Sequence, residues 1–217
     1  CLQELSIEKN NLQSLDPNLF INLSQLKKLN LCMNEIVKID SDVFKSLENL
    51  EELGLFNNKI KDIDSSLFKC LYNLEELDLS ENEIVHIEPN AFGNLRKLKK
   101  LNLDRNKISK IDSALFGNLT ELEDLNLYSN EISVIFPNSF DDLINLKYLD
   151  ISQNKLKEID PNTFNHLTKL KELYLFENQL TKIESNLLRN LSDLEVLFIR
   201  SNKIDEIKED SFDDLIK

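Results

Sequence analysis

The amino-acid sequence predicts an open, right-handed α/β solenoid, with a parallel β-sheet on its concave face and short helical or 3₁₀ turns and loops on its convex face. Two observations predict this fold class. The chain repeats with a period of 24 residues, and apolar residues occupy the same places in every repeat. Such a period is typical of solenoids, in which each repeat forms one coil that packs only against its neighbours.

The period divides residues 1–217, as one domain, into nine rows that start at residues 2, 26, 50, 74, 98, 122, 146, 170 and 194. Each row reads LxxLxLxxNxIxxIxxxxFxxLxx, with Leu and Ile interchanging, and all 63 sites at its seven apolar positions are apolar. Chance would give this with a probability on the order of 10⁻²⁴. Both ends fall at row boundaries without a Cys-rich cap, so we expect terminal caps to be absent from this segment.

The first part of each row predicts a short strand. Leu or Ile at the first, fourth and sixth positions would point inward, and equivalent strands of successive rows would pair in parallel. The third, fifth and seventh positions would then face solvent on the concave surface. We expect a Phe column, which begins at Phe20 and is interrupted only by Leu188, to stack behind the strands and widen the outer side of the arc.

An Asn occupies the ninth position of every row: Asn10, Asn34, Asn58, Asn82, Asn106, Asn130, Asn154, Asn178 and Asn202. A buried amide needs hydrogen-bond partners, and these side chains can satisfy backbone groups of the adjacent coil. We interpret them as a structural ladder. Further along each row, an acid, Ser or Pro precedes a bulky apolar residue, which is typical of the start of a short helical turn.

These residues resemble the leucine-rich repeat family, in the 24-residue, Phe-containing type found in Slit, Toll-like receptors and small leucine-rich proteoglycans. The resemblance covers the whole chain. It implies the fold strongly and the function only weakly, because the same framework carries receptors, adhesion proteins, inhibitors and scaffolds.

The composition argues against several functions. The net charge is −13 with a pI near 4.7, so a nucleic-acid backbone would be repelled. No apolar run is long enough to span a membrane. The three cysteines (Cys1, Cys32 and Cys70) and two histidines (His86 and His166) lack metal-ligand spacing, and no catalytic motif or cofactor site is present. We expect no metal, no cofactor, no enzymatic activity, and free thiols unless Cys1 has a partner outside this segment.

The columns between the strand leucines carry nine acids and three bases in 27 positions. The acidic patch predicted for the concave face comprises Glu52, Glu76, Asp78, Asp104, Asp124 and Asp150. Two interpretations remain open at this point. The acids either form a merely solvated face or steer a basic protein partner toward it.

The same columns become aromatic toward the end of the chain. The predicted partner-binding residues are Tyr128, Tyr148, Tyr174, Phe176, Val196, Phe198 and Arg200. Exposed Tyr and Phe are typical binding anchors, and Tyr174 and Phe198 share a column on adjacent strands, so their rings should touch. The alternatives are local cross-strand packing and contact with a further C-terminal module.

Three glycosylation sequons begin at Asn22, Asn118 and Asn190, all at one row position on the outer side. Together with the resemblance, they favour a protein-recognition module in the ectodomain of an extracellular or cell-surface receptor, adhesion or innate-immune protein. The alternative is an intracellular, cytoplasmic or bacterial interaction scaffold, which the unpaired cysteines favour. No row identifies an oligomerisation surface.

Overall fold

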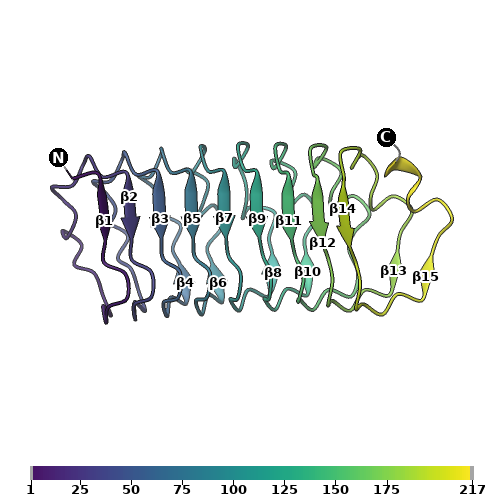
Figure 1. The fold of residues 1–217 in the computed structure, drawn as a ribbon, viewed down its shortest axis with the longest axis horizontal. Helices are drawn as coiled ribbons and strands as arrows, with labels where there is room; N and C mark the ends of the chain where they lie inside the picture. Colours follow the sequence, from purple (N-terminus) through teal and green to yellow (C-terminus); the bar gives the residue numbers. More distant parts are fainter. Residues whose placement is uncertain (1, 216–217) are drawn as a thin grey trace.

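The computed structural model describes residues 2–215, which form a continuous solenoid with the two termini at opposite ends (Figure 1). Within them, nine short strands form one parallel sheet: β1 (Glu4–Ser6), β2 (Lys28–Asn30), β3 (Glu52–Gly54), β5 (Glu76–Asp78), β7 (Lys100–Asn102), β9 (Asp124–Asn126), β11 (Tyr148–Asp150), β12 (Glu172–Tyr174) and β14 (Val196–Phe198). Neighbouring strands pair at an offset of 24 residues, as Leu5 does with Leu29. The parallel solenoid predicted from the period is therefore confirmed.

The apolar positions fill one core along the molecule. The Phe column is buried from Phe20 to Phe164, and the rings of Phe20 and Phe44 are stacked with centroids 6.5 Å apart. Leu188 takes the place of Phe in the eighth row and is also buried. Phe212 in the last row is 41% exposed, because no described coil lies beyond it. The predicted column is therefore buried in the interior coils and exposed at this end.

The Asn ladder is confirmed in atomic detail. The amide nitrogen of Asn58 donates to the backbone oxygen of Leu31 at 3.1 Å and of Leu55 at 3.0 Å. Its amide oxygen accepts from the backbone nitrogen of Ile36 at 3.0 Å. From Asn34 to Asn202 each Asn thus joins its own coil to the preceding one, and the seven interior members are buried, whereas Asn10 bonds only within the first coil.

The residue before each ladder Asn turns the chain out of the strand. In all nine rows this residue adopts a left-handed backbone conformation although none is glycine: Lys9, Met33, Asn57, Glu81, Arg105, Ser129, Gln153, Glu177 and Ser201, with φ between 49 and 57°. This conformation costs a residue with a side chain about 1–2 kcal/mol. The next residue is the ladder Asn, and its side-chain hydrogen bonds hold the turn in place.

The convex side consists of turns and loops, as predicted, but the turns stay isolated and do not extend into helices. Asp16 Oδ1 accepts from the backbone nitrogen of Asn18 at 2.8 Å, and the Asp16 carbonyl accepts from Leu19 at 2.9 Å. The next turn bonds join Asn18 to Ile21 and Phe20 to Leu23. Because bonds do not form at successive residues, no helix propagates. Within residues 2–215 the one helical segment is η1 (Asp213–Leu215).

Short strands on the flank of the solenoid were not predicted from the sequence. They are β4 (Asp62–Ile63), β6 (His86–Ile87), β8 (Lys110–Ile111), β10 (Val134–Ile135), β13 (Lys182–Ile183) and β15 (Glu206–Ile207). They form three separate parallel pairs, β4 with β6, β8 with β10 and β13 with β15, along the lower edge in Figure 1. The main sheet is continuous whereas the flank is not, so the strand face is the uninterrupted surface of the molecule.

Candidate functional site

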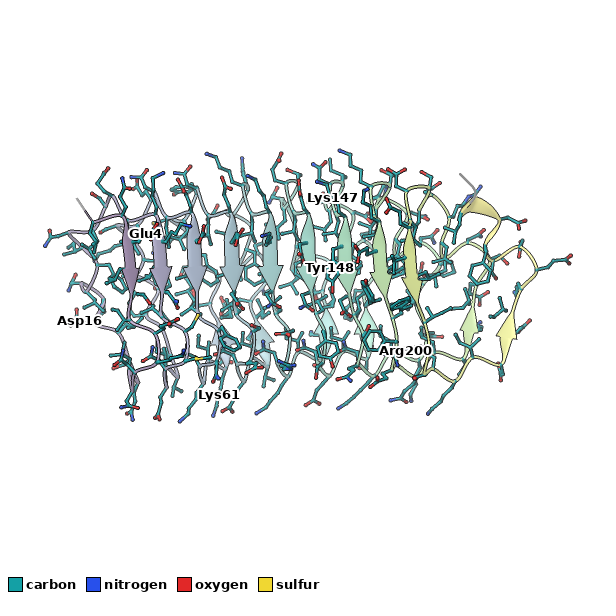
Figure 2. All side chains as sticks on the ribbon, in the orientation of Figure 1. Glu4, Asp16, Lys61, Lys147, Tyr148 and Arg200 are labelled. Atoms are coloured by element: carbon teal, nitrogen blue, oxygen red, sulfur yellow. The ribbon has the colours of Figure 1, made fainter. Side chains whose placement is uncertain are left out.

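The strand face is hollowed along much of its length. A groove of about 810 Å³ runs over it from β1 to β11 and is lined by side chains from seven strands. Figure 2 places Glu4 at one end of this face and Tyr148 and Arg200 in its C-terminal half. The groove thus begins on an acidic surface and ends at Tyr148. The strand face is concave, as the sequence predicted.

Acidic side chains at the fifth position of the rows are less exposed to solvent than the sequence predicted. Asp150 was predicted to face solvent, but it is only 7% exposed, so this prediction is wrong. Its carboxylate bends back and accepts from the backbone nitrogen of Ser152 at 2.8 Å, and Tyr148 Oη donates to it at 3.4 Å. Asp78 accepts from the backbone of Ser80 at 3.0 Å in the same way. Both acids therefore support the strand ends, and Asp78 also lines the groove.

Two further acids of the predicted patch are paired within the protein. Glu52 lies 2.6 Å from Lys28 Nζ, and Glu76 lies 2.9 Å from Lys100 Nζ. Both pairs are exposed, and such pairs contribute little to stability. Each lysine comes from the row next to that of its glutamate, so the patch is a mixed surface with an acidic excess.

Asp104 and Asp124 carry the remaining charge of the patch. Both are partly buried, and desolvation by the surrounding protein raises the pKa of each carboxyl. The positive charge of Arg105 opposes this rise at Asp104, and that of Lys100 opposes it at Asp124. Carboxylates that lose solvation without full compensation are favourable places for an incoming cation.

We call Tyr128, Tyr148, Tyr174, Phe176 and Phe198 the aromatic cluster. The rings of Tyr174 and Phe198 meet edge to face with centroids 5.3 Å apart, so the predicted contact is confirmed. Tyr174 also packs on Tyr148 at 5.4 Å and on Phe176 at 6.5 Å, and Phe176 packs on Tyr128 at 6.2 Å. The structure therefore joins the five rings into one surface, of which Phe198 is 49% exposed.

Two arginines border the aromatic cluster. The guanidinium of Arg200 lies 4.6 Å from the centroid of Phe176, and that of Arg105 lies 6.0 Å from the centroid of Tyr128. Arg200 was among the predicted residues, whereas Arg105 was missed because it occupies the left-handed eighth position rather than a strand column. Val196 lies beside Glu172 in the paired strands and is half-buried.

The cysteines and the possible metal ligands give no further site among the described residues. Cys32 and Cys70 are free thiols, as expected, and Cys1 lies outside the described residues. Burial raises the pKa of the Cys32 thiol to about 11, which makes it a poor nucleophile. Across residues 2–215, no cluster of His, Cys, Asp or Glu is arranged to hold a metal, and no helix has the length and hydrophobicity to cross a bilayer.

The sequon residues Asn22, Asn118 and Asn190 are all exposed on the turn side of their coils. Asn118 and Asn190 adopt left-handed conformations, with φ of 66° and 70°. Asn22 does not share this conformation. All three side chains therefore have room for a modification that would not cover the strand face.

Sequence-family models match the chain from end to end. A model described as leucine rich repeat matches residues 1–60 and 48–108, and one described as a BspA type leucine rich repeat region of six copies matches residues 85–217. The chain belongs to the leucine-rich repeat family. Among curated proteins, none matches significantly.

Solved leucine-rich repeat structures share the fold. The chain is 27% identical to the protein in a TLR13–ssRNA13 complex, with a TM-score of 0.87 over 99% of this chain and 35% of that one. A leucine-rich repeat protein of Leptospira interrogans is 30% identical, with a TM-score of 0.87 over 99% of this chain and 52% of that one. A chain of the Drosophila Toll–Spatzle complex is 21% identical, with a TM-score of 0.78 over 99% and 32%, and shows the fold alone.

This leucine-rich repeat chain thus spans about a third to about half of each of these neighbours. Members of the family are typically interaction modules rather than enzymes, and their stacked coils present extended concave surfaces for binding. Both the neighbours and the geometry of the strand face support a protein-interaction module.

Proposed function

We propose that this chain recognises a protein partner on its concave strand face, with the aromatic cluster, Val196 and Arg200 as the anchoring surface. The observation that carries the proposal is the packing of five aromatic rings at positions that face away from the core. A protein gains little stability from a half-exposed ring such as Phe198, whereas aromatic residues beside a groove are frequent hot spots of binding.

The acidic patch gives the partner a preferred charge. Glu52, Glu76, Asp104 and Asp124 retain carboxylates at or near the groove, so they would attract a basic surface and speed its approach. Asp78 and Asp150 contribute to this field while serving the strand ends. The ssRNA in the TLR13 complex belongs to that protein. For this chain we propose no nucleic-acid ligand, since its charge of −13 would repel phosphates.

The biological setting we propose is the ectodomain of a receptor, adhesion or innate-immune protein outside the cell or at its surface. The three exposed sequons and the Toll-like neighbour support this setting. The alternative is an intracellular or bacterial scaffold, which the bacterial neighbour and the free thiols of Cys32 and Cys70 favour. Mass spectrometry of the protein isolated from its native source would decide between them, since glycan on Asn22, Asn118 or Asn190 supports the first and unmodified sites the second.

The binding surface is testable without a known partner. Random peptides displayed on phage would be selected on the wild-type chain, and their affinities measured on variants. We expect the double variant Tyr174→Ala/Phe198→Ala to lose at least tenfold in affinity, because it removes the centre of the aromatic cluster. The matched variant Tyr72→Ala/Ile144→Ala removes two exposed apolar side chains away from the strand face and should bind normally. Equal affinities for all three proteins, with unchanged circular dichroism, would reject this surface.

A further inference from the structure

The acidic groove and the aromatic cluster meet at Tyr148. This residue lines the C-terminal end of the groove and also packs against Tyr174, with ring centroids 5.4 Å apart and planes inclined by 44°. Figure 2 shows it in the C-terminal half of the strand face. Its ring therefore adjoins both the charged and the apolar part of the surface.

Two carboxylates flank Tyr148 at the same height. In the sheet, Tyr148 on β11 is paired with Asp124 on β9 and with Glu172 on β12. Strands are about 4.8 Å apart, so the side chains of Asp124 and Glu172 leave the sheet on either side of Tyr148, each about one strand spacing away. Tyr174 Oη donates to Glu172 Oε2 at 2.7 Å, which fixes the position of that carboxylate.

The negative charge at this place is not balanced by a nearby unengaged cation among the described residues. Burial raises the pKa of Asp124, and the charges of Glu172 and Glu76 raise it further. Lys100 opposes this effect, but its Nζ lies 2.9 Å from Glu76 and is already paired. A second cation between Asp124 and Glu172 would therefore gain favourable charge interactions with both.

The chain itself shows which cation suits this surface. Guanidinium groups of Arg200 and Arg105 lie over Phe176 and Tyr128, at the edge of the aromatic cluster. In the described part of the chain, no cationic side chain is stacked on Tyr148 or Tyr174 in the same way. A planar guanidinium stacks on aromatic faces and forms several hydrogen bonds to carboxylates, which an ammonium does with less directionality.

We propose that Tyr148, Asp124 and Glu172 form a subsite for an arginine side chain of the protein partner. The guanidinium lies over the Tyr148 ring between the two carboxylates, and the neighbouring apolar residues of the partner contact Tyr174 and Phe198. This inference rests on the proposed recognition function and adds the chemistry of the residue that is recognised.

The probe for the test is N-acetyl-arginine amide. The protein has four tyrosines, so labelling with 3-fluorotyrosine gives four ¹⁹F signals, which single Tyr→Phe variants assign. We expect saturable shifts of the Tyr148 and Tyr174 signals on titration, while Tyr72, which lies away from the strand face, stays unchanged. N-acetyl-citrulline amide, which is neutral and of similar shape, should produce no saturable shift.

Variants locate the binding site further. Asp124→Asn and Glu172→Gln should each weaken the arginine probe about fivefold, which corresponds to the loss of one favourable charge contact. Glu35→Gln is the matched control, because Glu35 lies outside the strand columns, is paired with Lys59 at 3.3 Å, and should leave the affinity unchanged. Equal binding of citrulline or of N-acetyl-lysine amide, or equal shifts at Tyr72, would overturn the arginine subsite. If the probe fails while the Tyr174→Ala/Phe198→Ala variant still loses its selected peptides, the subsite is wrong and the recognition surface stands.

Discussion

Asn106 and Leu79 are 27 residues apart in sequence, yet the Asn106 amide nitrogen donates to the Leu79 backbone oxygen at 3.0 Å. The same amide donates to Leu103 and Asp104, and its oxygen accepts from Ile84 at 2.9 Å. One buried side chain thus joins two coils, and it is the acceptor for the backbone nitrogen of Ile84, whereas the carbonyls of Leu79, Leu103 and Asp104 also accept from other groups.

Asn106→Ala should therefore be strongly destabilising. It leaves the buried backbone nitrogen of Ile84 without a hydrogen bond and removes three further bonds to carbonyls, so we expect the free energy of unfolding to fall by about 3 kcal/mol. Urea denaturation followed by circular dichroism measures the change. Asn10→Ala removes an exposed Asn at the first coil and should cost less than about 1 kcal/mol. Similar losses for the two variants would contradict the structural role of burial in the ladder.

The Phe column should contribute according to the depth of each ring. Phe92 is fully buried, so Phe92→Ala is expected to cost about 3–5 kcal/mol through lost burial and a cavity. Phe212→Ala, at a ring that is 41% exposed, should cost about 1 kcal/mol or less. Thermal and urea unfolding of both variants would show this difference, and an equal effect would contradict it.

The left-handed eighth position offers a stabilising substitution. Ser129 has a φ of 54°, and no side-chain hydrogen bond of Ser129 is part of the ladder. Ser129→Gly should raise the free energy of unfolding by about 0.5–1 kcal/mol, because glycine adopts this conformation without strain. Ser129→Val should lower it, since β-branched residues are poorly tolerated there. A more stable Val variant in calorimetry would show that the backbone at this position is not strained.

The burial of Asp150 predicts that the stability of the protein depends on pH. Burial raises its pKa in the folded chain, so the folded state binds a proton more readily than the unfolded state, whose pKa is near 3.8. Asp150 therefore lowers the free energy of unfolding as the pH rises through its folded pKa. Asp150→Asn removes this effect and can keep the bond to Ser152, as Asn126 does to Tyr128. We expect it to stabilise the protein more at pH 7 than at pH 4.

Glu83→Gln is the control of opposite sign. The hydrogen bond from Lys107 lowers the pKa of Glu83, so this carboxylate stabilises the fold above its unfolded pKa and loses the effect as the pH falls. Glu83→Gln should therefore lower the free energy of unfolding more at pH 7 than at pH 4. Urea titrations at both pH values would test the pair, and a pH-independent effect of Asp150→Asn would contradict the role of burial.

The core of the fold could be predicted from the sequence because one pattern recurs in every coil. Leu5 and Leu29 fall into register as soon as the rows are aligned, and the ladder and the Phe column follow from the same alignment. The sequence predicted turns on the convex side but not whether they extend into helices, since an acid before Leu19 and Phe20 suits an isolated turn as well as a helix. The flank strands were missed because pairs of residues such as Asp62 and Ile63 are too short to carry a periodic signal.

The sequence predicted which residues of the candidate site share the strand face, but not which of their side chains are in contact. The sequence placed Tyr174 beside Phe198, since both lie at the fifth position of adjacent rows. It did not show that Asp150 bends back to Ser152, because an acid in an outward column has the same pattern whether or not it meets the backbone. It also missed Arg105, whose side chain reaches Tyr128 from outside the strand.

The constant offset of 24 residues between paired strands has a consequence for how such a chain changes over time. Gaining or losing one complete coil keeps every amide and ring aligned with its neighbour, whereas a single inserted residue would misalign the contacts between two coils. The molecule can therefore lengthen or shorten by whole units, and the residues that decide recognition can diverge from coil to coil while the scaffold beneath them stays the same.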